Sequence, residues 1–365
     1  MGFNCGIVGL PNVGKSTLFN AITAAGIAAE NYPFCTIDPN IGVVPVPDKR
    51  LDNLVKIYKP AKITPTSIEF VDIAGLVKGA SKGEGLGNQF LSHIRDVNAI
   101  CHVVRCFEDE NVVHVDGSVN PKRDVEIIEA ELILKDLDTV EKKMNDAEKR
   151  SKSGDKKIRA EADFYARIRE HLMGGRLAIY EKPDTPDEEL ILRDLHLLTA
   201  KPIMYIANVD EKHLTAEDGY VKQVRELAAK EGAKVVVACT KIEAEIASMP
   251  YGEREEFLRE LGVKESGLDQ VIHEGYALLD LITFFTAGPK EVRAWTVKRG
   301  SLAPQAAGEI HSDFERGFIR AEVMKHNDLV QLGSEAGVKE KGQLHVEGRE
   351  YVVEDGDVML FRFNV

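Results

Sequence analysis

The stretch GLPNVGKST, residues 9–17, matches the pattern GxxxxGK[ST] and decides how the N-terminal part of the chain folds. It lies between the apolar run CGIVGL, residues 5–10, and a segment with helical periodicity that begins at Ser16. Glycines let the backbone curl so that its N–H groups face phosphate oxygens, and a helix N-terminus adds partial positive charge. The stretch therefore predicts a phosphate-binding loop between a strand and a helix.

The residue types in this loop have separate tasks. Lys15 reaches the outer phosphates and takes part in catalysis, and Ser16 presents its hydroxyl oxygen to a magnesium ion. The other contacts come from backbone N–H groups of the loop and of the first helical turn. We expect the nucleotide phosphates to be bound by Asn12, Val13, Gly14, Lys15, Ser16 and Thr17.

Two further segments complete the predicted magnesium and γ-phosphate site. Asp72 ends the strand-like run IEFVD and can hold magnesium through a water molecule, while the N–H of Gly75 can bind a γ-phosphate. Thr36 lies between the two motifs, where its hydroxyl can complete the magnesium coordination. The alternatives are an ordinary turn for the DIAG motif, residues 72–75, and loop hydrogen bonding for Thr36. We expect Ser16, Thr36 and Asp72 to ligate the metal.

Short apolar runs rich in Val and Ile predict an α/β fold with buried parallel strands in a doubly wound sheet, because turns and helical periodicity follow most of them. The runs are CGIVGL, IEFVDIAGL, AICHVVRCF, PIMYIANV and KVVVAC. The third and fourth runs are separated by roughly a hundred residues, far more than one crossover helix requires. An additional element is therefore inserted between them.

The insertion carries the pattern of an antiparallel helical hairpin. Apolar residues step by four and three, the spacing of a coiled coil, and helical spacing resumes after the polar turn at residues 149–157. The two series are Ile133, Leu137, Val140, Met144 and Ala147, and then Ile158, Tyr165, Ile168 and Leu172. The tip is basic, with Lys149, Arg150, Lys152, Lys156, Lys157 and Arg159. It is either a solvated turn or a contact to a phosphate backbone.

From about residue 280 the pattern changes to closely spaced strands. These are EVRAWTV, FIRAEVM, QLHVEG, REYVVEDGD and VMLFRF, with one short helical stretch around residues 306–314. They predict a compact mixed sheet with one helix. No second phosphate loop occurs there, so this part is not a duplicated nucleotide site.

Together with an NxxE motif at residues 208–211, these motifs in this order resemble the YchF or Obg-like ATPase family within the translation-factor-related GTPases. The resemblance covers essentially the whole chain. It implies a P-loop nucleotide domain at residues 1–132 and 200–279, an inserted coiled-coil hairpin at residues 133–199, and a C-terminal TGS-like domain of β-grasp type at residues 280–365. It also implies a switch that binds and slowly hydrolyses ATP and acts on the ribosome or RNA in translation or stress regulation.

The NxxE motif bears on which base is bound. Typical GTPases have NKxD, whose aspartate accepts two hydrogen bonds from guanine, whereas this chain has Val209 and Glu211. The longer glutamate displaces the carboxylate, and adenine presents an acceptor where guanine has a donor. The resemblance therefore implies ATP, with GTP as a weaker or competing ligand. We expect the base to be contacted by Asn208, Val209, Glu211, Cys239 and Thr240. A plain turn is the alternative for this motif.

The sequence lacks the glutamine with which many related GTPases orient the attacking water. Leu76 follows the DxxG motif where many GTP-hydrolysing relatives have a glutamine, and leucine cannot orient water. His114 is our candidate for the missing polar group near the γ-phosphate, because imidazole can donate, accept and titrate near neutrality. A structural loop histidine is the alternative. Asn12 stands where cation-activated relatives have an asparagine that helps to hold a potassium ion, so potassium is a candidate activator.

Composition excludes some other classes of protein. The 365 residues carry a net charge of −13, which argues against a surface coated in basic residues, and no run of about 18 apolar residues suggests a membrane span. Five cysteines without ligand spacing fit reduced thiols. We therefore expect a cytoplasmic protein with no membrane partner. The motifs above predict a nucleoside triphosphatase that cleaves the β–γ phosphoanhydride. The oligomeric state is left open, with a monomer favoured. The alternatives are a GTP-specific switch and a nucleotide-gated ribosome- or RNA-binding factor for which hydrolysis is incidental.

Overall fold

A computed structural model describes residues 3–27, 40–73, 86–115, 117–151 and 155–364. The chain divides into two compact units, residues 1–43 with 69–271 and residues 44–68 with 272–365. The inserted helices belong to the first unit, and residues 44–68 join the C-terminal unit, outside the predicted range of 280–365. The three-domain division with its boundaries stays a prediction.

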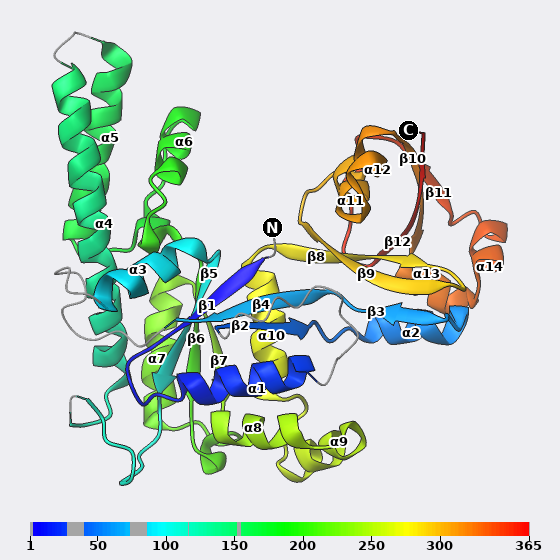
Figure 1. Ribbon diagram of the computed structural model, residues 1–365, viewed down its shortest axis with the longest axis horizontal. Coiled ribbons are helices and arrows are strands. Elements are labelled where there is room, and N and C mark those ends of the chain that lie inside the picture. The colour runs from blue at the N-terminus through cyan, green and yellow to red at the C-terminus, as the bar shows by residue number, and fades with distance from the viewer. Residues whose placement is uncertain (1–2, 28–39, 74–85, 116, 152–154, 365) are drawn as a thin grey trace. The chain divides into compact units, whose positions relative to one another are not determined.

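The first unit is built on a six-stranded sheet (Figure 1). Its strand order is β2-β4-β1-β5-β6-β7, and β1 runs parallel to β4 and β5, as β6 does to β5 and β7. The strands are β1 (Asn4–Val8), β2 (Ile41–Pro45), β4 (Ser67–Asp72), β5 (Ala99–Arg105), β6 (Ile203–Asn208) and β7 (Lys234–Ala238). All five apolar runs form strands, so the predicted α/β fold is confirmed; β2 was not foreseen.

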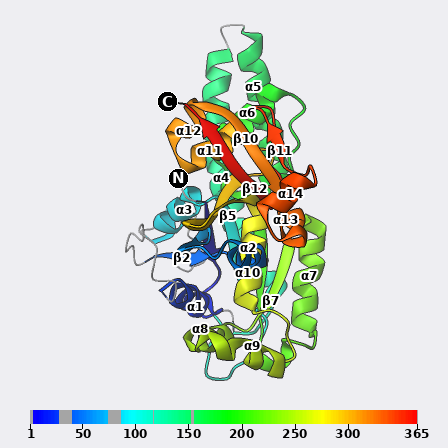
Figure 2. The same ribbon diagram turned by 90° about the vertical axis from the view of Figure 1, so that its right-hand side faces the viewer.

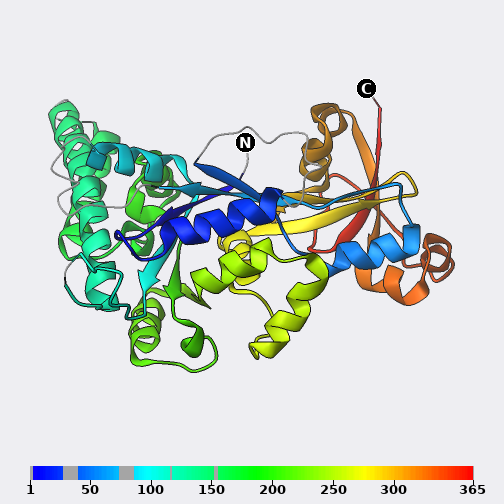
Figure 3. The same cartoon turned by 60° about the horizontal axis from the view of Figure 1, so that its bottom comes forward.

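Helices pack beside this sheet. Figure 3 shows α1 and α8 next to each other, and α4 packs against α7. The helices and 3₁₀ turns of this unit are α1 (Lys15–Ile27), α3 (Leu86–Asp96), α4 (Pro121–Ser151), α5 (Lys156–Met173), η2 (Ala178–Tyr180), α6 (Pro186–Asp194), η3 (Leu198–Ala200), η4 (Glu211–His213), α7 (Gly219–Glu231), α8 (Thr240–Ser248), α9 (Tyr251–Glu260) and α10 (Gly267–Leu278), whose last residues continue into the second unit. None of the helices in the described ranges is long and apolar enough to cross a membrane.

The predicted helical hairpin is confirmed by α4 and α5, which lie side by side (Figures 1 and 2). Apolar positions of the two helices face one another in one core, which contains every member of the predicted series except Ile158. The buried members of this core on the two helices are Ile133, Val140, Ala147, Ala162, Phe164, Tyr165, Ile168 and Leu172, with Leu137 and Met144 packed against them. The helix α4 begins earlier than expected, at Pro121, because Val125, Ile128 and Leu132 are apolar and buried in its first turns.

A partly buried acidic cluster joins α4, β6 and α7. The hydroxyl of Tyr205 lies 2.8 Å from a carboxyl oxygen of Glu129 and 2.6 Å from one of Glu231. A phenol has one proton, so it can donate to one carboxylate only and must accept from the other carboxyl group. Burial, and then the charge of Glu231, raise the pKa of Glu129 to about 8. One proton is therefore shared within the cluster near neutral pH.

The second unit has a mixed sheet in the order β11-β10-β12-β8-β9-β3. Its elements are α2 (Lys49–Tyr58), β3 (Lys62–Thr64), β8 (Leu281–Ala287), β9 (Glu291–Lys298), α11 (Ala303–Ile310), α12 (Ser312–Arg316), β10 (Phe318–Lys325), α13 (His326–Leu332), α14 (Glu335–Glu340), β11 (His345–Glu347) and β12 (Asp357–Phe363). Alanines of α11 pack on Phe284 and Phe361, and Leu51 of α2 and Leu329 of α13 lie in a second core with Phe285.

Two expectations for this unit are wrong. The run REYVVEDGD was predicted as a strand but forms only a bridge between Leu302 and Val352, because the chain reverses at Gly356, whose φ is +93°, before β12 begins. The carboxylate of Asp357 accepts the N–H of Glu354 and stabilises that turn. The expectation of one helix from about residue 280 onward is also wrong: the described residues there form four helices, because the short α12, α13 and α14 accompany α11.

Candidate phosphate-binding site

The segment between β1 and α1 folds as a loop that ends in a helix N-terminus. Lys15 is the first residue of α1 and its side chain is buried, while Ser16 and Thr17 are exposed in the first turn. The first N–H groups of a helix have no partner within it, so they are available to an anion. The structure therefore brings a lysine, two hydroxyls and free backbone donors together at one point.

Two glycines allow the loop to pass close to its neighbours. A Cβ atom on Gly9 would lie 2.7 Å from the carbonyl oxygen of Val103 on β5. Gly14 has φ +100°, and a Cβ atom there would collide with the side-chain amide of Asn208 and lie 2.9 Å from the Thr240 hydroxyl. Neither position leaves room for a side chain, and Gly14 also adopts a backbone conformation that favours glycine.

Asn208 connects the phosphate loop to the loop after β7. Its Nδ2 donates to the carbonyl oxygen of Val13 at 2.8 Å, and its Oδ1 accepts the N–H of Thr240 at 3.0 Å. The side chain is buried, so both bonds are protected from water. In the structure the side chain of Asn208 holds the two loops together, and its predicted contact with the base stays a prediction. The motif order gave no signal for the link between the two loops.

Asn12 is the exposed residue of the loop. It has φ +62°, a left-handed conformation that asparagine tolerates better than most residues, and its Nδ2 donates to the carbonyl oxygen of Val113 at 3.1 Å. This bond joins the phosphate loop to the loop that follows β5. Arg105, fully buried at the end of β5, fixes that second loop by donating to the carbonyl oxygens of Phe107 and Val112 at 3.0 and 2.9 Å. No sequence motif indicated that Arg105 holds this loop.

Asp72 ends β4 next to β1, in register with Ile7 two residues before the loop. Its Oδ1 is buried, and within the described ranges no hydrogen-bond partner reaches it. Buried carboxylate oxygens normally have a partner. A missing partner at this place fits a metal ion or a metal-bound water, which are the ligands that the sequence predicts for Asp72.

His114 lies in the loop held by Arg105, one residue beyond the contact of Asn12. Its ring is buried, and Nε2 lies 2.8 Å from Oδ2 of Asp124 in the first turn of α4. Asp124 also accepts from the guanidinium of Arg123 at 2.9 Å. The histidine therefore follows the residue that contacts the phosphate loop and is held by a carboxylate, a partner that no sequence motif indicated.

The residues predicted for the base lie on two adjacent loops. Val209 is buried and its N–H donates to the carbonyl oxygen of Ala238, while the Glu211 side chain is exposed. Cys239 and Thr240 are buried at the start of α8, and burial raises the pKa of the Cys239 thiol. The structure brings these residues together with Asn208. Thr36, Gly75 and Leu76 lie outside the described residues.

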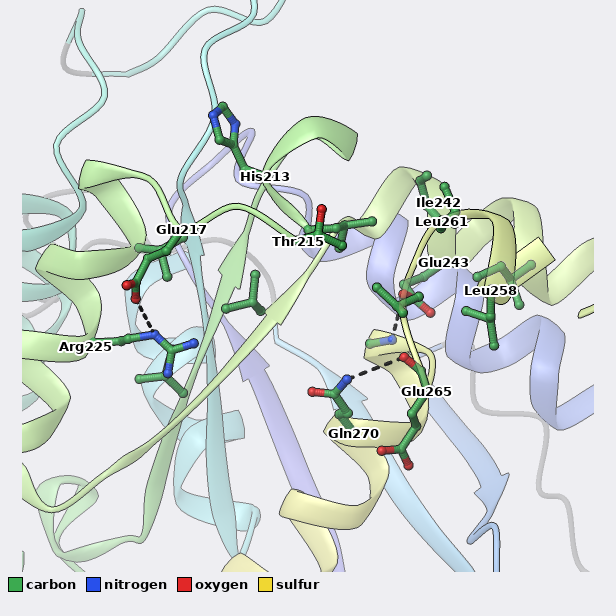
Figure 4. A pocket seen from close by; sticks show the side chains of 17 residues that line it. His213, Thr215, Glu217, Arg225, Ile242, Glu243, Leu258, Leu261, Glu265 and Gln270 are labelled. Atoms are coloured by element: carbon green, nitrogen blue, oxygen red, sulfur yellow. Dashed lines mark hydrogen bonds and ion pairs between the residues drawn. The ribbon is translucent and has the colours of Figure 1, made fainter. Parts of the chain in front are cut away.

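A cavity of about 600 Å³ lies beside β7 at the edge of the sheet (Figure 4). Its lining is mixed: aliphatic residues such as Val221, Val237 and Ile246 lie beside polar and charged ones, and an ion pair joins Glu217 to Arg225 at 2.9 Å. None of the predicted nucleotide contacts lines it. The phosphate loop remains the better candidate site, because three carboxylates, Glu217, Glu243 and Glu265, line the cavity and its one arginine is already paired with Glu217.

Comparisons with known proteins agree with this geometry. Residues 4–150 match the family model MMR_HSR1, described as a 50S ribosome-binding GTPase, and residues 281–364 match YchF-GTPase_C, described as a protein of unknown function (DUF933). The chain is 56% identical over 366 residues to the "Ribosome-binding ATPase YchF" of Escherichia coli O157:H7, and 55% identical over 372 residues to that of Bacillus subtilis. Both matches cover 100% of each chain.

A solved structure extends the comparison to the fold. The Schizosaccharomyces pombe YchF GTPase superposes with a TM-score of 0.90 at 39% identity, over 99% of this chain and 98% of that one. The likeness therefore spans the nucleotide domain, the inserted helices and the C-terminal sheet, as the resemblance in sequence implied. Such identity over the full length shows that this chain belongs to the YchF family.

Proposed function

We propose that this protein is a magnesium-dependent nucleoside triphosphatase that prefers ATP and uses slow hydrolysis to time its action on the ribosome. The observation that carries the proposal is the convergence of a buried Lys15, a helix N-terminus and an orphaned buried oxygen of Asp72 beside a glycine loop. These are the groups that bind and polarise a β–γ phosphoanhydride. The printed names of the bacterial relatives, ribosome-binding ATPases, support it.

Ser16, Thr36 and Asp72 would hold the magnesium ion. Ser16 is exposed in the first turn of α1 and Asp72 has an unsatisfied oxygen at the end of β4. When bound, the metal neutralises charge that develops on the phosphate oxygens. Lys15 binds the same oxygens from the protein side, and the N–H of Gly75 is proposed to bind the γ-phosphate.

His114 and Asn12 are proposed to act around the attacking water. For His114 to meet a water at the γ-phosphate, its ring has to leave Asp124 or share its proton with it, because the ring is buried against that carboxylate. This requirement fits slow intrinsic turnover. Asn12 keeps its side-chain oxygen for a potassium ion while its Nδ2 donates to Val113.

Val209, Glu211, Cys239 and Thr240 are proposed to surround the base, with Asn208 acting mainly as the tie between the loops. The exposed carboxylate of Glu211 can accept a hydrogen bond from the adenine amino group. It is one methylene group farther from the backbone than the carboxylate of the aspartate that binds guanine in NKxD proteins. ATP is therefore the preferred ligand and GTP a weaker one. A GTP-specific switch is the competing function.

Calorimetric titration of the full chain with ATP and with GTP, each with magnesium, tests the proposed function. We expect ATP to bind at least tenfold more tightly than GTP, a difference of about 1.4 kcal/mol that one or two hydrogen bonds to a base can supply. Tighter binding of GTP would favour the competing switch. Binding of neither nucleotide by folded protein would refute the proposal.

The hairpin tip is the proposed contact to ribosomal RNA. Lys149, Arg150, Lys156, Lys157 and Arg159 lie at the ends of α4 and α5, where long exposed cations can reach phosphates. This positive charge is confined to the tip, whereas the whole chain carries a net charge of −13. Hydrolysis that is incidental to ribosome binding is the alternative.

We further propose a cytoplasmic monomer with separate nucleotide, hairpin and TGS-like domains.

Charge reversal at the tip should weaken ribosome binding without changing basal turnover. In the double variant Lys156→Glu and Lys157→Glu, we expect roughly tenfold weaker co-sedimentation with ribosomes, because two phosphate contacts become repulsive. Glutamate suits the first turn of α5, so the helix should remain folded.

The matched control places the same change on α4 outside the tip. Lys122→Glu with Lys142→Glu alters two exposed lysines of α4 that do not line the pocket at the tip, and it should leave ribosome affinity within about twofold. Equal losses in the two double variants would show that net charge matters and the tip does not.

A further inference from the structure

The segment after β6 is fixed at three successive residues. Asn208 is held by its side chain to the phosphate loop and to Thr240, and the N–H of Val209 donates to the carbonyl oxygen of Ala238 at 2.9 Å. Asp210 then begins the turn η4, which contains Glu211. The backbone that leads to Glu211 is therefore anchored from both sides.

Asp210 closes this turn through a single oxygen. Its Oδ1 accepts the N–H of His213 at 3.1 Å and faces Nδ1 of the same residue at 2.6 Å. The acceptor is a carboxylate, so Nδ1 carries the proton. The two side chains are 41% and 36% exposed, and a polar contact so open to water adds little to global stability. The contact acts on local conformation.

Glu211 stands directly between these two residues. It is the first residue of η4, its side chain is exposed, and in the described part of the chain its carboxylate takes part in no ion pair. A glutamate has three side-chain torsions, so the direction of its carboxylate depends on a fixed Cα position. The turn supplies that position. Figure 4 shows His213 on the same turn, at the rim of the cavity beside β7.

We propose that Asp210 and His213 are positioning residues for base selection: they close η4 around Glu211 and so direct its carboxylate to the edge of the bound purine. The inference rests on the proposed function and deepens it. Adenine and guanine differ only in the donors and acceptors on that edge, so a carboxylate with a fixed approach discriminates and a mobile one does not. The turn therefore sets the ratio of ATP to GTP affinity.

Calorimetry with three ligands tests this role: Mg-ATP, Mg-GTP and inorganic tripolyphosphate with magnesium. In Asp210→Ala the ratio of ATP to GTP affinity should fall about fivefold, as expected for the loss of one oriented hydrogen bond to the base. His213→Ala removes only the side-chain contact, so a smaller fall is expected. Affinity for tripolyphosphate, which has no base, should not change in either variant.

Two control variants separate positioning from general damage. Asp210→Asn keeps an acceptor oxygen at the same place and should keep the ratio within about twofold. Asp218→Ala removes a similar cap, the bond from Asp218 to the N–H of Val221 at 2.8 Å, from α7 and should leave the ratio unchanged.

An unchanged ratio in folded Asp210→Ala would overturn the inference while leaving the proposed function intact. An equal weakening of all three ligands would also overturn it, because that pattern indicates a damaged phosphate site. If Asp210→Ala does not fold, His213→Ala decides on the same criteria. Wild-type protein that binds tripolyphosphate but neither nucleotide would instead refute the proposed function, on which the inference depends.

Discussion

Replacement of Gly14 by alanine is expected to weaken nucleotide binding about a hundredfold. The new Cβ would collide with the side-chain amide of Asn208 and crowd the Thr240 hydroxyl, so Asn208 has to move. Its bonds to Val13 and Thr240 then break, and two buried hydrogen bonds of about 1 to 1.5 kcal/mol each correspond to that factor. Titration with Mg-ATP measures the loss.

Gly232→Ala is the matched control for this change. Gly232 also has a positive φ, +63°, but no atom lies within 4 Å of a Cβ added there. Alanine therefore meets backbone strain from a positive φ, about 1 kcal/mol in the free energy of unfolding, with no collision. We expect nucleotide affinity to be unchanged in Gly232→Ala. Equal losses of affinity in both variants would mean that backbone strain, and not the contact with Asn208, controls the site.

The acidic cluster of Glu129, Glu231 and Tyr205 should make stability fall as pH rises. In the folded protein Glu129 keeps its proton to about pH 8, because burial and the charge of Glu231 raise its pKa from 4.5. The folded state therefore binds more protons than the unfolded state between these values. This stabilising contribution is complete below pH 4.5 and is lost by about pH 8.

The variant Glu129→Gln isolates this effect, because its amide stays neutral and still donates a hydrogen bond. Between pH 6 and pH 9 the wild-type free energy of unfolding should fall by about 2 kcal/mol more than that of the variant. Partial exposure of the cluster reduces the full value expected from the pKa shift. Urea denaturation at each pH measures the difference.

Glu245→Gln serves as the control for the pH series. Glu245 is exposed on α8, away from the cluster, so its removal should shift the stability curve by a constant amount. Parallel curves for wild type and Glu129→Gln would contradict the shared proton.

Local patterns predicted the core of the fold because each pattern matched a local cause. The runs around Ile7, Phe70 and Val103 became buried strands, and the stripe through Val140 and Ile168 became the interior of the hairpin. The run around Val352 failed, since alternation of apolar residues cannot show that Gly356 and Asp357 turn the chain there. Strand β3 was missed because its partner, β9, lies more than two hundred residues away.

The candidate site was also predicted only in part from the sequence. Lys15, Ser16 and Asp72 were assigned from motifs whose spacing follows from phosphate and metal chemistry, and the structure brings them together. The contacts of Asn208 with Val13 and of His114 with Asp124 could not be predicted, because no local pattern records which distant group a polar side chain meets. Such pairs are set by packing of the whole unit.

The length of α4 has a mechanical consequence. Its first turn carries Asp124, which holds His114, and its last turn carries Lys149 and Arg150 at the far end of the hairpin. At 1.5 Å per residue, its 31 residues form a rod of about 46 Å with no proline after its first residue, Pro121. A force or torque applied at the distal end of α4 is therefore transmitted through one uninterrupted helix to Asp124 and His114. The helix has no internal break at which a bend could absorb it.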